Sequence, residues 1–187
     1  MTVDRVAIRS YVGRMSSDST VAAVSDDVPA ELFKAAMGSV CTPVSVVTAY
    51  DGQRPHGTTV SAFCSLSLTP PMVLVALDHG SALLHVVQNS RRFGLNVLSH
   101  DQHAIAGKFA VKGDDKFRDV DWLDRSGAPH ISGSSCWFAC EVVEFVEGGD
   151  HAVVLGLVVE TDHEDRAPLT YHRQVFGTHA ASSQHSA

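Results

Sequence analysis

Hydroxyl side chains are crowded into one short stretch, GTTVSAFCSLSLTPP at Gly57–Pro71, where several groups of one type could do chemistry together. The hydroxyls belong to Thr58, Thr59, Ser61, Ser65, Ser67 and Thr69. Because strand side chains alternate between two faces, the last four can share one face if the strand contains a bulge. That face would offer hydroxyl and backbone donors to the polar edge of a ring or to a phosphate. The alternative is a half-exposed strand with a polar outer face, which composition alone favours.

A histidine beside a tight turn is the second candidate. Gly149 and Asp150 are turn residues, and His151 follows them at the start of the apolar run AVVLGLVVE. A histidine in this position lies at the rim of a barrel, where ligands enter, although a turn histidine without a task is an equal alternative. The loop Asp115-Lys116-Phe117, followed by Trp122, is ordinary when considered alone.

The overall charge excludes some partners. The chain has 187 residues, 44% of them hydrophobic, and a formal net charge of −7. An acidic chain is a poor general binder of nucleic acid or of anionic membranes. An anionic cofactor would therefore need backbone donors or local positive charge. Such charge is concentrated at Arg91, Arg92, Lys108, Lys112 and Lys116.

Length and composition predict a single domain with no membrane partner. No apolar run approaches the roughly 20 residues that span a bilayer, and the N-terminus lacks the apolar stretch of a secretory signal, so we expect a cytoplasmic protein. We expect a variable, mobile arm at residues 1–26, one domain at 27–178 and a flexible tail at 179–187. The four cysteines form no CxxC pair, which favours buried free thiols. No HxxxH or CxxC spacing occurs either, so we expect no metal site.

Short strands dominate the pattern between these ends. A helix is predicted at Pro29–Gly38, where Asp27 can cap it and Met37 belongs to its apolar positions, which we interpret as core. Two more helices are predicted, Ser81–Gln88 capped by Ser81 and Ser99–Ala110 with a capping box of Ser99 and Gln102. The predicted strands are Val44–Ala49, Gly57–Leu66, Met72–Leu77, Phe93–Leu98, Trp137–Val146, Ala152–Thr161 and Leu169–Arg173.

This arrangement of elements predicts an antiparallel barrel or sandwich rather than a βαβ sheet. Gly148-Gly149-Asp150 predicts a hairpin turn between two of the later strands. The chain has neither GxGxxG nor a Walker pattern, so a nucleotide cofactor would not bind in the Rossmann manner.

Six segments, in order, resemble the flavin reductase family of the FMN-binding split-barrel superfamily, the reductase partners of two-component flavin monooxygenases. The segments are FKAAMGSVCTPVSVVTA, HGTTVSAFCSLSLTPPMVLVAL, FGLNVLSHDQHAIAGKFA, DDKF, GGDHAVVLG and PLTYHRQVFG. The resemblance runs from about Leu32 to Gly177. It implies a mainly β fold, an antiparallel Greek-key split β-barrel with a few short flanking helices.

The resemblance also implies roles for individual residues. In similar proteins the segment matching Cys41–Val44 lies along the isoalloxazine ring, and the block matching Thr58–Phe63 contacts its polar edge. His151 corresponds to the histidine associated with the nicotinamide, and is expected to orient or cover that ring rather than to act as an obligatory acid. The cofactor-binding residues implied are Cys41, Thr42, Pro43, Val44, Thr58, Thr59, Val60, Ser61, Ala62, Phe63, Ser65, Ser81, Arg92, Phe93, Asp150, His151 and Tyr171, with Ser67 a further candidate. Many relatives have a serine where this chain has Ala62, so one hydroxyl contact is missing here.

The implied function is that of an NAD(P)H:flavin oxidoreductase. It would transfer hydride from NADH, or NADPH, to FMN or FAD, and supply reduced flavin to a separate monooxygenase. Similar proteins are homodimers, so a homodimer is expected. The alternative is a split-barrel protein with a tightly bound prosthetic flavin that reduces another acceptor, such as ferric iron, or only binds flavin. The choices between FMN and FAD, and between NADH and NADPH, stay open.

Overall fold

The computed structural model describes residues 28–113 and 115–180 of the chain. The chain divides into two units, Met1–Met37 and Gly38–Ala187. Most of the first unit, with the predicted arm at 1–26 and the proposed cap Asp27, lies outside the described residues. Its one described helix, α2 (Ala30–Gly38), confirms the predicted helix and carries an ion pair between Lys34 and Glu31 at 2.9 Å. α2 buries none of its residues, so the interpretation of Met37 as core is wrong.

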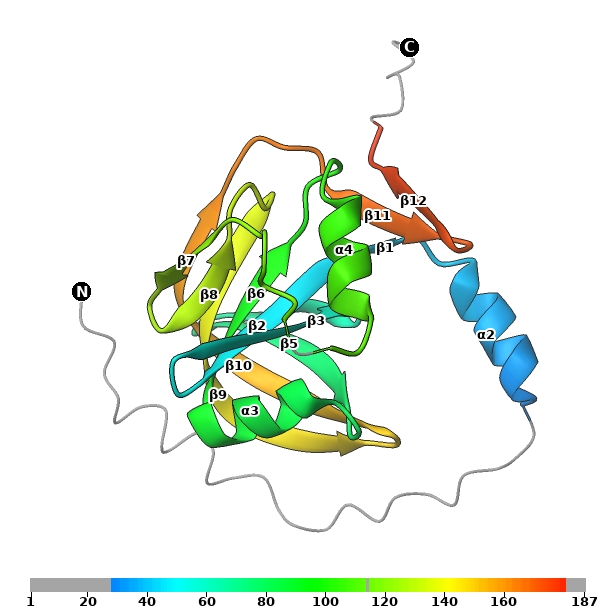
Figure 1. Ribbon diagram of the computed structural model, residues 1–187. Helices are drawn as coiled ribbons and strands as arrows, with labels where there is room; N and C mark the ends of the chain where they lie inside the picture. The colour runs from blue at the N-terminus through cyan, green and yellow to red at the C-terminus, as the bar shows by residue number, and fades with distance from the viewer. Residues whose placement is uncertain (1–27, 114, 181–187) are drawn as a thin grey trace. The chain divides into compact units, whose positions relative to one another are not determined.

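A seven-stranded antiparallel sheet forms the body of the second unit (Figure 1). Its strands are β2 (Ser45–Asp51), β3 (Arg54–Val60), β4 (Phe63–Leu68), β5 (Pro71–Asp78), β6 (Arg92–Val97), β9 (Cys136–Gly148) and β10 (His151–His163). They are arranged in the order β3-β2-β6-β9-β10-β5-β4. The two edge strands, β3 and β4, follow each other in sequence, so the sheet curls until its edges approach. The result is the predicted split barrel.

The predicted strand Gly57–Leu66 is therefore two strands on opposite edges of the sheet. Ser61 and Ala62 lie between them, where the Phe63 amide donates to the Ser61 carbonyl at 3.2 Å in a tight turn. Periodicity could not show this break, because the residues on both sides remain extended and similar in composition. The bulge expected in this segment does occur, between Ser65 and Ser67 of β4.

Two small sheets flank the barrel. One contains β1 (Thr42–Pro43), β11 (Leu169–His172) and β12 (Val175–Thr178), and the other is the hairpin of β7 (Trp122–Arg125) and β8 (Ala128–Ile131). β7, β8 and β12 were not predicted. They are only four residues long, too short for a clear alternation. The β7–β8 turn places Ser126 and Gly127 at φ of 49° and 73°, the positive values that a two-residue hairpin loop requires.

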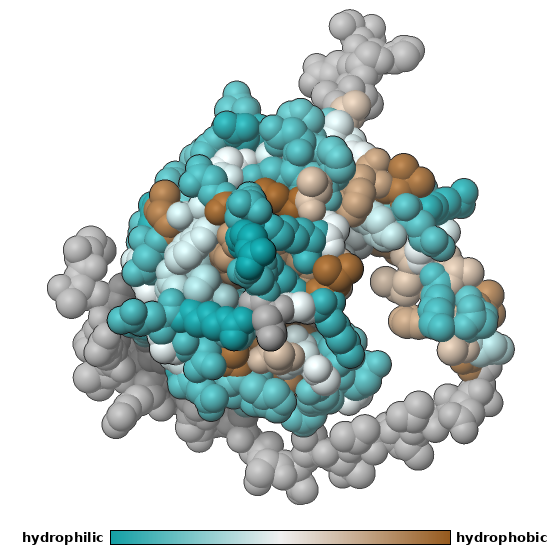
Figure 2. All heavy atoms as spheres, in the orientation of Figure 1, coloured by the Kyte–Doolittle hydropathy of each residue, from teal (hydrophilic) through white to brown (hydrophobic). Residues whose placement is uncertain are grey.

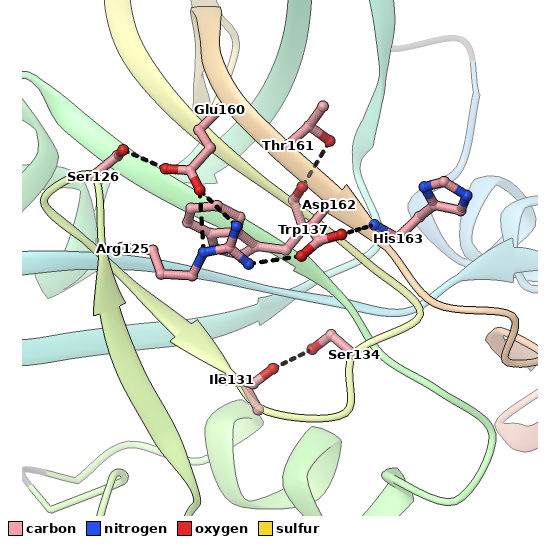
Figure 3. Close-up of polar contacts among 9 residues, drawn as sticks. All are labelled: Arg125, Ser126, Ile131, Ser134, Trp137, Glu160, Thr161, Asp162 and His163. Atoms are coloured by element: carbon pink, nitrogen blue, oxygen red, sulfur yellow. Dashed lines mark hydrogen bonds and ion pairs between the residues drawn. The ribbon is translucent and has the colours of Figure 1, made fainter.

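A polar network ties the β7–β8 hairpin to β10 (Figure 3). The Arg125 guanidinium donates to Glu160 at 2.6 Å and to Asp162 at 2.9 Å, and it lies 4.7 Å from the centre of the Trp137 ring. The Ser126 hydroxyl donates to the second oxygen of Glu160. Several charge-assisted contacts on one side chain fix the hairpin better than an isolated surface pair would.

Two helices cover the barrel. α3 (Ala82–Ser90) inserts Leu83, Leu84, Val86 and Val87 into the apolar interior of the sheet. Ser81 is its N-cap residue, as predicted, but its hydroxyl makes no capping bond. α4 (His103–Ala110) begins later than the predicted Ser99.

Only half of the expected capping box exists at α4. The Gln102 side chain accepts from the Ser99 amide at 3.0 Å, whereas the Ser99 hydroxyl donates to Asp101 at 2.5 Å. The turn between Ser99 and the helix is therefore held by side chains, and the helix itself starts at His103.

All four cysteine thiols are free, but only some are buried. Cys140 is buried and Cys136 is half-buried, whereas Cys41 and Cys64 are exposed, so the prediction of buried thiols is wrong for this second pair. Burial raises the pKa of Cys140 to about 12, which keeps it protonated and unreactive. None of the described helices is long and apolar enough to cross a membrane.

Candidate functional site

A cavity opens where the barrel is split, between β3 and the end of β5. Its volume is about 260 Å³. The residues that line it come from four segments of the chain: Thr58, Thr59, Val60, Ser61, Ala62, Ala76, Leu77, Asp78, Ser81 and His151. Six of these lining residues were predicted from the sequence to bind flavin: Thr58, Thr59, Val60, Ser61, Ala62 and Ser81. His151, the predicted contact of the nicotinamide, faces the same cavity.

Free backbone donors face the cavity at the crossing from β3 to β4. The carbonyl groups of Ser61 and Ala62 accept from Phe63 and from Ala76, but neither of their amides donates to any described residue. The Ser61 hydroxyl likewise has no partner in the described part of the chain. Unpaired amide and hydroxyl donors on an exposed rim are suited to carbonyl and ring-nitrogen acceptors of a ligand.

The edge strand β3 packs against α4 on the side away from the cavity, and this contact fixes the position of its donors. The Thr59 hydroxyl donates to the Ala106 carbonyl of α4 at 2.7 Å, and therefore anchors the strand rather than facing a ligand. Gly57 packs under α4 so closely that a Cβ there would lie 2.6 Å from the Phe109 ring. Thr58, which lies between these two anchors, lines the cavity, and its hydroxyl has no partner among the described residues.

A second, larger cavity of about 630 Å³ adjoins the first. The two share Thr58, Asp78 and Ser81, and the second extends over the start of α3 to Lys112 and Lys116. The first amides of a helix attract anions, and at α3 no side chain occupies them. This cavity therefore combines helix amides and ammonium groups in an otherwise acidic protein.

Lys116 has a structural role as well as a charge. Its ammonium group donates to the Gly57 carbonyl at 3.1 Å and to the Phe109 carbonyl at 2.9 Å, so it joins β3 to α4. Partial burial lowers the pKa of Lys116. Sequence reasoning treated Asp115-Lys116-Phe117 as an ordinary loop, because only the fold brings it beside β3.

His151 lines the first cavity beside the end of β5. It begins β10, paired with Asp78 of β5, and its Nδ1 lies 2.7 Å from Oδ1 of Asp150. This contact lowers the pKa of Asp150, since the hydrogen bond favours the carboxylate. A carboxylate at Nδ1 selects the tautomer with the proton on that nitrogen, which leaves Nε2 as the acceptor for a ligand.

Other predicted residues lie away from this cavity. Tyr171 pairs with Thr42 in the β1–β11 ladder and contacts the Phe176 ring at 5.2 Å. Val44 is buried in one apolar cluster of the core, and Phe63 packs against another. Besides Arg92 and Phe93, the remaining predicted residues that do not line the cavity are Cys41, Pro43, Ser65, Ser67 and Asp150. Contacts of these residues with flavin stay predictions, since none of the residues lines this cavity.

Arg92 and Phe93 also have other roles. The Arg92 guanidinium forms an ion pair with Glu141 at 2.7 Å. Phe93 is completely buried, and a Cβ at Gly156 would lie only 2.5 Å from its ring. The Phe93 side chain is therefore a core residue, which the missing side chain at Gly156 accommodates. A contact of the Arg92-Phe93 segment with flavin stays a prediction.

Three lining residues were missed from the sequence. All three end strand β5; Ala76 and Leu77 were predicted only as part of a strand, and Asp78 was given no role. The signal that could have located them was the partner strand: a hairpin from Gly148 to Asp150 followed by β10 places His151 beside the end of β5. Within residues 28–113 and 115–180, no group of three or more His, Cys, Asp or Glu side chains is arranged to hold a metal ion.

Comparison with known proteins identifies the family of this barrel. Residues 37–180 match the family model of the flavin reductase-like domain. This chain belongs to the flavin reductase-like family. The family and the fold class predicted from the sequence are thereby confirmed, and the cavity at the split of the barrel becomes the candidate flavin site.

Relatives with named activities agree with this assignment. The flavin reductase-like chain is 37% identical over 145 residues to the reductase component of 4-nitrophenol 4-monooxygenase/4-nitrocatechol 2-monooxygenase of Rhodococcus opacus, which covers 78% of each protein. It is 35% identical over 146 residues to the FMN reductase (NADH) SmoA of Agrobacterium fabrum, with 78% of this chain and 83% of SmoA covered.

Solved structures share the fold over most of the chain. Flavin reductase PheA2 superposes with a TM-score of 0.77 and 31% identity, covering 82% of this chain and 100% of PheA2. The NADH:FAD oxidoreductase SgcE6 of Streptomyces globisporus, in complex with NAD and FAD fragments, gives a TM-score of 0.78 and 30% identity over 82% of this chain and 94% of its own. The activity and the cofactors expected from the sequence, flavin reduction with NADH, agree with the names of these relatives.

Proposed function

We propose that this chain reduces FMN or FAD with NADH, in the cavity at the split of the barrel. The observation that supports this most directly is the arrangement of that cavity. The unpaired amides of Ser61 and Ala62 lie on one wall, and His151 lies on another. One wall can hold the polar edge of a flavin while the other meets the ring of the hydride donor.

The residues present fit a flavin. The polar edge of an isoalloxazine ring carries carbonyl and nitrogen acceptors, which match the amide donors at Ser61 and Ala62 and the hydroxyl of Thr58. Bound flavin and NADH supply the redox chemistry, and the protein supplies binding and orientation. No side-chain nucleophile is required for this chemistry.

The larger cavity would hold the phosphate part of the flavin. The uncapped start of α3 presents backbone donors, while Lys112 and Lys116 add positive charge. These donors would contact the phosphate and not the adenine base that only FAD carries, so they suit both FMN and FAD. Asp78, at the junction of the two cavities, is the only shared lining residue with a carboxylate.

His151 would orient or cover the nicotinamide through Nε2. Its carboxylate partner Asp150 holds Nδ1 at 2.7 Å and so restricts rotation of the ring. The side chain of His151 is 39% exposed, which leaves part of its surface free for a ligand. This arrangement positions a group without requiring His151 to donate a proton.

We further propose that the reduced flavin passes to a separate monooxygenase and that the protein is a homodimer. The names of relatives, reductase components of monooxygenases, support the first point. Edge strand β4 supports the second, since Leu68 is 92% exposed and an open edge with apolar side chains is normally covered. A monomer by light scattering at working concentration would contradict the homodimer. The expected cytoplasmic location stays a prediction.

The decisive experiment measures NADH oxidation by the purified protein with FMN, FAD, riboflavin or no flavin added. Saturation kinetics in added flavin, with little activity in its absence, is the expected result. Activity that does not depend on added flavin, in a protein that retains a yellow cofactor, would indicate a prosthetic flavin instead. No NADH oxidation with any flavin would refute the proposed function.

A further inference from the structure

The loop between β5 and α3 contacts the β9–β10 turn at two points, and both involve His79. The backbone amide of His79 donates to the Asp150 carbonyl at 3.1 Å. Its ring nitrogen Nε2 lies 3.2 Å from a carboxylate oxygen of Glu147. Glu147 is near the end of β9 and Asp150 is in the turn, so His79 holds the turn on both sides.

The turn has little other support. Gly148 and Gly149 are both exposed, and Gly149 has a φ of 74°, as a glycine turn allows. Apart from His79, no described residue outside the hairpin forms a hydrogen bond or ion pair with Glu147 or with Gly148–Asp150. A two-glycine turn of this kind is flexible unless something outside it fixes its position.

The loop that carries His79 is itself fixed. Asp78 accepts from the Gly80 amide at 2.6 Å through its side chain, and from the Ser81 amide at 2.9 Å through its carbonyl. Asp78 also pairs with His151 across the β5–β10 ladder. The loop is therefore a rigid support beside the site, and it also carries Ser81, where the two cavities meet.

We propose that His79 is a positioning residue that, with Glu147 as its partner, holds the Asp150–His151 turn against the cavity. This inference rests on the proposed function, in which His151 meets the nicotinamide. His79 lines neither cavity, so it acts through the turn. A small misplacement of a group that orients a substrate can cost up to about 10²-fold in rate.

The contact predicts a selective kinetic effect. Loss of the His79 side chain removes the contact with Glu147. It leaves the hydrogen bond from the His79 amide to the Asp150 carbonyl, so the turn is loosened rather than released. The flavin donors at Ser61 and Ala62 are held through β2, α4 and the Ala76 amide of β5, and in the described part of the chain none of these forms a hydrogen bond or ion pair with the His79 side chain. We therefore expect His79→Ala to raise KM for NADH by roughly 5- to 10-fold while KM for flavin stays within about twofold.

A double-mutant cycle tests the partner. If His79 and Glu147 act together, Glu147→Ala should reproduce the effect of His79→Ala, and the double variant should be no worse than either single one. His79→Gln, whose side-chain amide can still donate to Glu147, should restore most of the affinity for NADH. His163→Ala is the matched control, because His163 is an exposed histidine at the other end of the same strand.

A measurement without flavin or turnover separates this proposal from the proposed function. In the ligand-free protein, the His79 amide should exchange with solvent faster in Glu147→Ala than in wild type, since the turn that accepts its hydrogen bond is loosened. An unchanged exchange rate, additive kinetic effects, or equal changes in KM for NADH and for flavin would each overturn the role of His79. If wild type oxidises no NADH, the proposed function fails, whereas the exchange comparison still decides whether His79 and Glu147 hold the turn.

Discussion

The Ala76 amide donates to the Ala62 carbonyl at 2.9 Å, and this bond marks the point where the chain passes from one edge of the sheet to the other. Because Ala62 pairs with β5 through its carbonyl only, its amide and that of Ser61 remain unpaired at the rim of the cavity. The donors of the candidate flavin site thus follow from the topology of the split barrel. Side-chain chemistry adds to them but does not create them.

The hydroxyl at this crossing should contribute measurably to flavin binding. Ser61→Ala removes a hydroxyl that faces the cavity and has no protein partner, so a flavin contact is its main loss. A net hydrogen bond of about 1 kcal/mol corresponds to a flavin Kd roughly fivefold weaker. Ala62→Ser would add a second hydroxyl at the crossing, and should tighten flavin binding by up to a similar factor. Quenching of flavin fluorescence on titration measures both.

Ser126→Ala is the control for this pair. The Ser126 hydroxyl, in the β7–β8 turn, donates to Glu160 and does not line the cavity. Its flavin Kd should equal that of wild type. If Ser61→Ala also leaves Kd unchanged, the polar edge of the flavin does not lie at the β3–β4 crossing.

Replacement of His151 should separate the two substrates. His151→Ala removes a ring that lines the cavity, and we expect KM for NADH to rise by roughly tenfold with flavin Kd within about twofold of wild type. Steady-state kinetics at several flavin concentrations gives both constants. Unchanged kinetics would show that His151 is a turn residue without a role in hydride transfer.

The positive charge in the larger cavity should strengthen binding only of flavins that carry a phosphate. Lys112 is exposed there, whereas Lys116 is committed to two carbonyl groups, so Lys112→Met is the cleaner test. We expect FMN to bind about 3- to 10-fold more weakly and riboflavin to bind as in wild type, because riboflavin has no phosphate. The comparison of the two Kd values by titration isolates the charge contribution.

Lys108→Met removes the same charge outside that cavity, where Lys108 donates to the Arg118 carbonyl. If this control weakens FMN as much as Lys112→Met does, the effect reflects the overall charge of the protein. Equal losses for FMN and riboflavin would instead place the phosphate elsewhere.

The sequence predicted the strands well where a buried face imposed alternation and a turn marked the end. β5, for example, was predicted at Met72–Leu77 and spans Pro71–Asp78. It could not predict that Gly57–Leu66 divides at Ser61, since closure of the barrel depends on contacts between residues far apart in the chain. Nor could it show that Phe93 is buried: an aromatic residue beside Arg92 has the same local pattern whether its ring meets the core or a ligand.

Family resemblance located both walls of the cavity, through Thr58–Ala62 and through His151. The supporting contacts were not accessible in this way. Lys116 was counted from the sequence as local positive charge and lies in the segment DDKF, but its contact with the Gly57 carbonyl at 3.1 Å appears only in the fold. His79 becomes significant only because a loop meets a turn about 70 residues further along the chain. Such contacts between distant segments leave no periodic signal.

His130 should make the stability of the protein depend on pH. It lies against Trp137, with ring centres 4.9 Å apart, and burial together with the nearby charge of Arg125 lowers its pKa from the ordinary value. The folded protein therefore takes up this proton less readily than the unfolded chain does. Since the unfolded state binds more protons once the pH falls below about 6.5, the free energy of unfolding should decrease as the pH falls through that value, and level off below the folded pKa.

Urea unfolding between pH 7.5 and 5 measures this dependence. His130→Gln has no proton to gain, so its free energy of unfolding should fall less steeply over this range than that of wild type, even if the variant is less stable at pH 7.5. The difference between the two slopes isolates His130 from the other histidines, which are common to both proteins. Parallel curves for the two proteins would mean that His130 titrates alike in the folded and unfolded states, and that its contact with Trp137 has no consequence for its protonation.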